Sequence, residues 1–232
     1  MGKIMGLKKQ QEKNDDNRKK ILIVDDHPIV RQGLTGLINQ ENDLMVCGQA
    51  EDVHQAIKAI GTLKPDMAIV DICLKETSGM ELIKDIKVQY PSLPVLALSM
   101  HDESLYAERA LRAGAKGYIT KQQATEKVII AIRKVLSGQI YVSDSMAATM
   151  VSKLVGGKPQ TGDSPIDRLS DRELEVFLLI GQGYGTQQIS ERLHLSVKTI
   201  ETYRAHIKEK LNLTKATQLL QYAIKWVNSR NG

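Results

Sequence analysis

The sequence predicts an α/β protein: a five-stranded, doubly wound parallel sheet followed by a small all-α domain. Three observations lead to this prediction. Between residues 20 and 140, short β-branched runs alternate with amphipathic stretches of about 10 to 13 residues. A stretch rich in Gly, Pro and Ser interrupts the pattern at 156–165. Beyond it the pattern is helical throughout, and a length of 232 residues suits two small domains with a connector.

Each predicted strand is a short apolar run, and each is followed by a helical pattern. In the first of these helices, 28–39, Pro28 suits the first helical position. Strands joined by helices pair in parallel and have helices on both faces of the sheet. The five predicted strands are Ile21–Val24, Met45–Cys47, Met67–Val70, Val95–Leu98 and Gly117–Thr120.

The helical part begins after a connector in which 143–154 fits a short helix. Helices are then expected over 170–182, 186–193, 196–211 and from 214 to about 228. Ser170 with Glu173 forms a capping box, and Thr186, Ser196 and Thr214 are suitable caps. We therefore divide the chain into a basic N-terminal arm (1–19), an α/β domain (20–140), a connector (141–166) and a helical domain (167–232).

The composition indicates a cytoplasmic protein without membrane association. Apolar residues make up 42% and charged residues 25%, which excludes a mostly disordered chain. The longest apolar runs hold only about half a dozen residues, too few to span a bilayer. The first 20 residues lack the apolar segment of a secretory signal, and two cysteines fit a reducing compartment.

The charge distribution differs between the two parts of the chain. Residues 21–145 carry 13 Lys and Arg against 16 Asp and Glu, whereas residues 165–232 carry 10 against 7. A basic C-terminal part is a weak indication of nucleic-acid binding, and ordinary solvated surface explains it equally well. With one Phe and one Trp, the chain lacks platforms for stacking single-stranded bases, so double-stranded DNA is favoured.

Polar residues follow four of the five predicted strands. Asp25 and Asp26 follow the first strand, and Asp71, Ser99 and Lys121 follow the third, fourth and fifth. In a parallel sheet these positions share one edge. Each residue alone has a structural explanation, such as helix capping. Three converging carboxylates, however, require a hard divalent cation such as Mg²⁺, and a lysine and a hydroxyl beside it suit an anion.

This constellation suits phosphoryl transfer to a carboxylate. A carboxylate can attack a phosphoryl group, while a metal ion and an ammonium group neutralise the equatorial oxygens. Asp71 is the expected nucleophile because the apolar strand before it fixes its position. The Asp25–Asp26 pair offers the acidic density expected of metal ligands.

Residues 20 to 140 resemble a response-regulator receiver domain, which has a flavodoxin-like fold. The resemblance rests on Ile21-Leu-Ile-Val-Asp-Asp-His-Pro28, Asp71 with Gly79 eight residues on, Ser99, and Lys116-Gly-Tyr-Ile-Thr-Lys121. It implies that Asp71 accepts the phosphoryl group and that Ser99 and Lys121 contact it. It further implies that Tyr118 is a switch that turns inward with Ser99. The implied Mg²⁺ ligands are Asp25, acting mainly through water, Asp26, Asp71 and the backbone carbonyl of Cys73.

Two residues depart from the receiver pattern. Lys75 stands where proline is usual, four residues after Asp71, so the loop loses a fixed φ. Met100 follows Ser99 where small residues are common, and its flexible side chain would narrow access to Asp71. Both changes support an alternative function, that of a protein-interaction switch that works without phosphate.

The helices of the C-terminal part have helix-turn-helix spacing, with short turns at 183–185 and 194–195. In the helix over 196–211, Ile200, Tyr203, Ile207 and Leu211 form the predicted buried stripe. The opposite face would enter a major groove, although a plain helical bundle fits the spacing as well. The predicted DNA-contacting residues are Lys198, Thr199, Glu201, Thr202 and Ala205, with Arg204, Lys208 and Lys210 placed for phosphates.

This part resembles the LuxR-type helix-turn-helix through Leu169-Ser-Asp-Arg-Glu173 and Leu195-Ser-Val-Lys-Thr199 together with the residues that follow. A receiver joined to this module is similar to response regulators of the NarL/FixJ class. The resemblance implies a transcriptional regulator, not an enzyme, that a histidine kinase phosphorylates and that binds DNA as a homodimer. A phosphohydrolase is a third hypothesis, but no further substrate-binding motif supports it.

Overall fold

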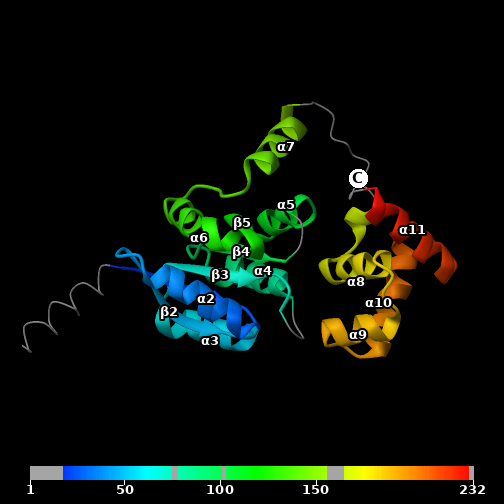
Figure 1. Cartoon of the computed structure of the whole chain (residues 1–232), viewed down its shortest axis with the longest axis horizontal. Coiled ribbons are helices and arrows are strands. Elements are labelled where there is room, and N and C mark those ends of the chain that lie inside the picture. Colours follow the sequence, from blue (N-terminus) through cyan, green and yellow to red (C-terminus); the bar gives the residue numbers. More distant parts are fainter. Residues whose placement is uncertain (1–17, 75–77, 101–102, 156–164, 230–232) are drawn as a thin grey trace, which may run out of the picture. The chain divides into compact units, whose positions relative to one another are not determined.

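The computed structural model describes residues 18–74, 78–100, 103–155 and 165–229 and forms two compact units, 1–150 and 151–232 (Figure 1). The first unit holds a five-stranded parallel sheet with helices, and the second is helical. The predicted fold class is confirmed. The boundaries proposed from the sequence, at 19/20, 140/141 and 166/167, stay predictions.

The sheet of the first unit has the strand order β2-β1-β3-β4-β5. Val24 pairs with Val70, Asp71 with Leu98, and Ser99 with Thr120, so the C-terminal strand ends lie side by side. β1 and β2 are longer than predicted, because backbone pairing continues beyond the apolar residues. The strands are β1 (Lys19–Val24), β2 (Leu44–Ala50), β3 (Met67–Asp71), β4 (Val95–Ser99) and β5 (Gly117–Thr120).

Helices cover both faces of this sheet. Leu34 and Ile38 of α2 and Val128 of α6 share one apolar cluster with alternate strand residues such as Ile21 and Ile23. The intervening strand residues are equally buried, and α3, α4 and α5 contact one another in turn. The helices are α2 (Pro28–Asn39), α3 (Val53–Leu63), α4 (Gly79–Gln89), α5 (Glu103–Ala113) and α6 (Lys121–Leu136).

After α6 the chain returns to the outer edge of β5. The amide of Tyr118 donates to the carbonyl of Tyr141 at 2.8 Å, and the amide of Tyr141 donates to the carbonyl of Lys116 at 3.0 Å. The amide of Ser143 donates to Glu103 at 2.7 Å, and α7 (Asp144–Val155) follows. The first residues of the predicted connector therefore belong to the edge of the sheet.

Over its described residues 165–229, the second unit contains a short 3-10 helix, η1 (Pro165–Arg168), and four α-helices. Ser170 and Ser196 cap helices as predicted. Two other predicted caps were wrong: the N-cap residues are Gly185 and Lys215, instead of Thr186 and Thr214. Gln188 and Gln218 accept from the amides of these residues at 2.9 Å and so replace a threonine cap. The helices are α8 (Asp171–Gly181), α9 (Thr186–Leu193), α10 (Val197–Lys210) and α11 (Ala216–Asn228).

The core of the second unit lies between α8 and α11. The ring of Phe177 contacts the rings of Tyr222 and Trp226, with centroids 6.0 and 5.7 Å apart. α10 contributes Ile200 and Ile207, whereas Tyr203, predicted to be buried with them, is only half-buried. Its phenol explains this difference, since a hydroxyl group favours contact with water.

Candidate functional site

An acidic pocket lies at the C-terminal edge of the sheet in the first unit. Asp25 and Asp71 are buried, and Asp26 is nearly so. The Nζ atom of Lys121 lies 2.7 Å from Oδ2 of Asp25 and 2.7 Å from Oδ2 of Asp71. Ser99, also buried, ends the neighbouring strand β4. The structure thus brings together the predicted carboxylates and the predicted lysine.

Backbone amides fix the two carboxylates that bind Lys121. Oδ1 of Asp25 accepts from the amide of His27 at 2.8 Å, and Oδ1 of Asp71 accepts from the amide of Cys73 at 3.0 Å. Each carboxylate therefore has one oxygen held by its own loop and the other turned to the ammonium group. These contacts within the protein hold both carboxylates in place.

The electrostatics of the pocket are set by burial and by neighbouring charges. Burial raises the pKa of Asp71 to about 6; Asp25 adds to this increase, while Lys121 opposes it. Burial opposes the charge on Lys121, but Asp71 and Asp25 outweigh it and raise the lysine pKa. The pocket holds three carboxyl groups and one ammonium group, and a divalent cation would offset the resulting excess of acidic groups. The oxygen donors present are those that Mg²⁺ prefers, so the residues fit this ion.

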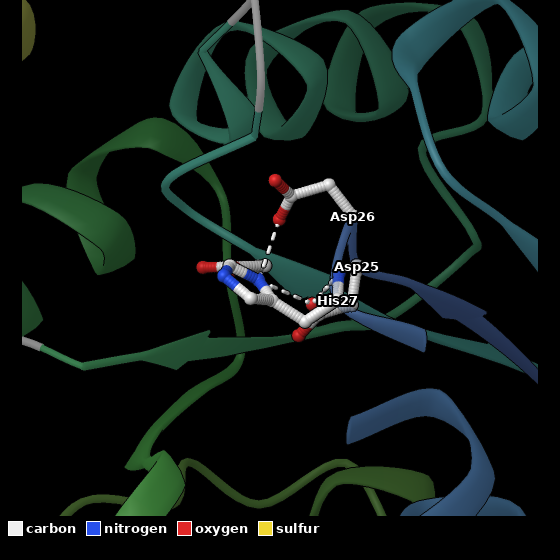
Figure 2. A group of neighbouring side chains, drawn as sticks. Asp25, Asp26 and His27 are labelled. Atoms are coloured by element: carbon white, nitrogen blue, oxygen red, sulfur yellow. Dashed lines mark hydrogen bonds and ion pairs between the residues drawn. The ribbon is translucent and has the colours of Figure 1, made fainter. Parts of the chain in front are cut away.

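Two residues of this region were missed by the sequence analysis. The ring of His27 lies against Asp25 and Asp26 (Figure 2), with Nδ1 3.2 Å and 2.8 Å from their Oδ1 atoms. Arg31 is buried; it donates to the carbonyl of Asp25 at 2.6 Å and to Glu51 at 2.6 Å. The sequence could have predicted the burial of Arg31, because helical periodicity places it three residues before Leu34 on the buried face of α2.

Three further residues singled out in the sequence are Lys75 and Met100, which depart from the receiver pattern, and Tyr118, the predicted switch. Lys75 lies outside the described residues. Met100 directly follows β4 and is 64% exposed. Tyr118 is buried within β5. An inward Tyr118 is one of the two positions implied for a switch residue.

In the second unit, α10 presents a polar face. Lys198, Glu201, Thr202 and Ala205 are exposed, as the helical periodicity predicts. Thr199 is half-buried, and its hydroxyl lies 2.7 Å from that of Ser196. A hollow of about 240 Å³ lies beside this face, lined by Thr186, Glu201, Arg204, Ala205, Lys208, Ala216 and Leu219.

Two of the basic residues predicted to contact phosphate have different surroundings. Burial lowers the pKa of Arg204, with Glu201 opposing the change, and Arg204 is one of the residues that line the hollow. The Nζ atom of Lys210 is instead 2.6 Å from Oε2 of Glu173, which also closes the capping box of α8. Lys210 therefore holds α10 against α8, whatever it contributes to DNA binding.

Both parts of the chain match known families. Residues 21–133 match the response regulator receiver domain, and residues 167–223 match the bacterial regulatory proteins of the luxR family. The chain is 38% identical over 209 residues to the oxygen regulatory protein NreC of Staphylococcus carnosus, covering 88% of this chain and 96% of that protein. NreC of Staphylococcus aureus is 38% identical over 210 residues.

Solved structures give the same result. The RcsB response regulator of Salmonella typhimurium is 28% identical, with a TM-score of 0.62, over 90% of this chain and 98% of that one. RcsB bound to a promoter in the presence of the phosphomimetic BeF₃⁻ has a TM-score of 0.57 over 89% and 98%.

The fold and the two matched domains define a response regulator. The chain belongs to the response regulators that join a receiver domain to a LuxR-type DNA-binding domain. Such a protein is a transcriptional regulator controlled by phosphorylation. In the described parts of the chain, no helix combines the length and the apolar character needed to cross a bilayer.

Proposed function

We propose that this chain accepts a phosphoryl group on Asp71 from a histidine kinase and that the modification controls its binding to double-stranded DNA. The observation that carries the proposal is the contact of Lys121 with both Asp25 and Asp71, at 2.7 Å each, in a buried acidic pocket. A structural ion pair alone would not require a third carboxylate beside it, yet Asp26 lies there.

The proposed reaction is an in-line displacement at phosphorus. A carboxylate oxygen of Asp71 attacks the phosphorus atom, and the bond from phosphorus to the kinase histidine nitrogen breaks. The imidazole leaves with that electron pair, and an aspartyl phosphate forms. Lys121 would bind a phosphoryl oxygen, since its ammonium group already contacts Asp71. Ser99 would donate its hydroxyl to another.

Asp25, acting mainly through water, Asp26, Asp71 and the backbone carbonyl of Cys73 would hold Mg²⁺. Bound there, the ion would neutralise charge on the phosphoryl oxygens. Tyr118 would change its side-chain position when Asp71 is phosphorylated. It lies on β5, and Lys121, which would bind the phosphoryl group, directly follows that strand.

The wider proposal concerns partners and location. RcsB has been solved bound to promoter DNA, and as two dimers bound to two parallel DNAs. By likeness to it, we propose that this chain binds DNA as a homodimer when phosphorylated. We further propose a cytoplasmic location, where a kinase domain and DNA are both accessible, and no catalysis on a separate substrate.

The proposal is tested by measuring DNA affinity of the full chain before and after phosphorylation. DNA selected from a random pool is labelled, and fluorescence anisotropy is recorded at fixed salt, with acetyl phosphate and Mg²⁺ present or absent. Phosphorylation, followed on Phos-tag gels, is expected to change the affinity by at least tenfold, or about 1.4 kcal/mol. Full labelling at unchanged DNA affinity would instead favour a protein-interaction switch.

Residues of α10 are expected to fall into two classes of DNA contact. Lys198→Ala and Thr202→Ala, on the exposed face, should each cost about 1 to 3 kcal/mol and relax base preference at particular positions. Lys208→Ala should weaken binding to all sequences alike and lower the salt slope by about one unit. Selected-sequence logos and salt titrations distinguish the two classes.

Lys225, exposed near the end of α11, provides the control for loss of charge. Lys225→Ala should leave the selected sequence logo as it is. An unchanged logo for Thr202→Ala as well would show that α10 presents a different face to DNA.

A further inference from the structure

We propose that His27 is a metal ligand of the acidic pocket and that its imidazole lets the pocket bind divalent transition-metal ions more tightly than an oxygen-only site would. The inference rests on the metal site of the proposed function and adds a ligand to it. It concerns which cation the pocket prefers. Three carboxylates without His27 would favour Mg²⁺.

The first support is the spacing of the ligand atoms. One atom each from Asp25, Asp26, His27 and Asp71 lies within 4.8 Å of all the others. Metal–ligand bonds of about 2.0 to 2.3 Å put opposite ligands about 4 to 4.6 Å apart. The four atoms therefore already lie almost within the span of a single coordination shell.

The second support is the way in which the backbone positions the ring. His27 is the N-cap residue of α2, with extended backbone angles, and Pro28 follows at the first helical position. Its amide is bound to Asp25, and its carbonyl accepts from the amides of Val30 and Arg31 at 3.1 and 3.2 Å. Three backbone hydrogen bonds thus hold the residue whose ring faces the carboxylates in Figure 2.

The third support is that Nδ1 has polar neighbours of the pocket on more than one side. It lies 2.8 Å from Oδ1 of Asp26 and 3.2 Å from Oδ1 of Asp25, distances at which an N–H donates to these carboxylates, and 3.5 Å from Nζ of Lys121. A metal ion that replaces this proton would be bound by the same nitrogen and the same carboxylate oxygens.

Ligand chemistry then gives the selectivity. Carboxylates and water suit Mg²⁺, which keeps several waters and gains little from a nitrogen ligand. Imidazole suits Zn, Cu, Fe and Ni ions, and the transition-metal ions accept mixed nitrogen and oxygen ligands. His27 therefore strengthens the binding of transition-metal ions and leaves Mg²⁺ binding nearly unchanged.

The test uses Cu²⁺ as the probe on the full chain, at one equivalent, because it favours imidazole and its electron spin reports directly bound nitrogen. Wild-type protein with Cu²⁺ is expected to show a ¹⁴N coupling by pulsed electron paramagnetic resonance, replaced by a ¹⁵N coupling after labelling with ¹⁵N-histidine. His27→Ala and His27→Gln should lose the coupling and bind Cu²⁺ about tenfold more weakly. Their Mg²⁺ affinity, measured by competition, should change less than twofold.

His54→Ala is the matched control, since His54 is an exposed histidine on α3. It should keep both the coupling and the affinity. Bound Cu²⁺ without nitrogen coupling in the wild type, or a coupling that survives both His27 variants, would overturn the inference. A wild-type chain that binds no Cu²⁺ would overturn it as well. Phosphoryl labelling of Asp71 is scored separately, so a labelled chain without nitrogen coupling refutes only the ligand role of His27.

Discussion

Asp71→Asn is expected to abolish phosphoryl uptake from acetyl phosphate. The amide keeps the shape of the carboxylate and its place at the end of β3, but it has no anionic oxygen to attack phosphorus. Phos-tag gels of the full chain, with Mg²⁺ and a small phosphodonor, measure the result. The shifted band should be absent at all reaction times, and Mg²⁺ binding should persist through the remaining oxygen ligands.

We expect the variant to fold, because the buried charge of Asp71 makes the wild-type fold less stable than it would be with a neutral side chain. Burial raises the pKa of Asp71 to about 6 in the folded chain, above the usual value for an aspartate. An acid whose pKa is raised by folding lowers stability above the folded pKa, and this loss disappears as the pH falls below the unfolded pKa. Asp71→Asn should therefore melt no earlier than wild type at pH 7, and any gain should shrink between pH 7 and pH 4.

Asp85→Asn provides the control, because Asp85 is an exposed carboxylate on α4. It should label at the wild-type rate. If Asp71→Asn still accepts a phosphoryl group, another carboxylate is the acceptor, and the assigned roles of Lys121 and Ser99 would need revision.

Local sequence patterns were enough to predict the acidic pocket. Asp25, Asp71 and Ser99 each follow a short apolar run that the alternation with helical patterns predicts to be a buried strand, as it is in the structure. Parallel pairing then brings their strand ends together without any further information. The same holds for Lys121, which directly follows β5. For these residues, position along the chain determines position in space.

Residues whose roles depend on a distant partner could not be predicted in this way. Arg31 binds the carbonyl of Asp25 and the side chain of Glu51, 20 residues away. For Lys210 the sequence predicted only a phosphate contact, which stays a prediction, and gave no sign of the ion pair with Glu173, 2.6 Å away on α8. Tyr141 lies against β5 because that edge is open to backbone pairing, which no side-chain pattern records.

Glycine at position 79 was noted only as part of a pattern, and the structure gives its physical reason. Gly79 is the first residue of α4, and its amide donates to the carbonyl of Ile72 at 3.1 Å. A Cβ atom there would lie 1.8 Å from the carbonyl oxygen of Asp71 and 2.8 Å from Cα of Ile72. The backbone at the end of β3 occupies the space that any other side chain needs.

Gly79→Ala is therefore expected to destabilise the receiver by about 3 kcal/mol and to reduce phosphoryl uptake severely. The clash is with backbone atoms, so a change of rotamer cannot relieve it. Either α4 must move outward or the segment that carries Asp71 must shift, and both changes disturb the contact between Asp71 and Lys121. Denaturant melts and Phos-tag labelling of the same preparation measure the two effects.

Gly36→Ala separates this effect from the general consequence of replacing glycine. Gly36 lies in the middle of α2, where an added Cβ meets no atom within 4 Å. Alanine there should stabilise the chain by about 0.5 to 1 kcal/mol, because glycine is the poorer helix former. Opposite signs for the two variants would show that the close approach of α4 to β3 holds Asp71 in place. If Gly79→Ala melts and labels like wild type, the backbone at the end of β3 can shift without loss of stability. The position of Asp71 would then not depend on the close contact with Gly79.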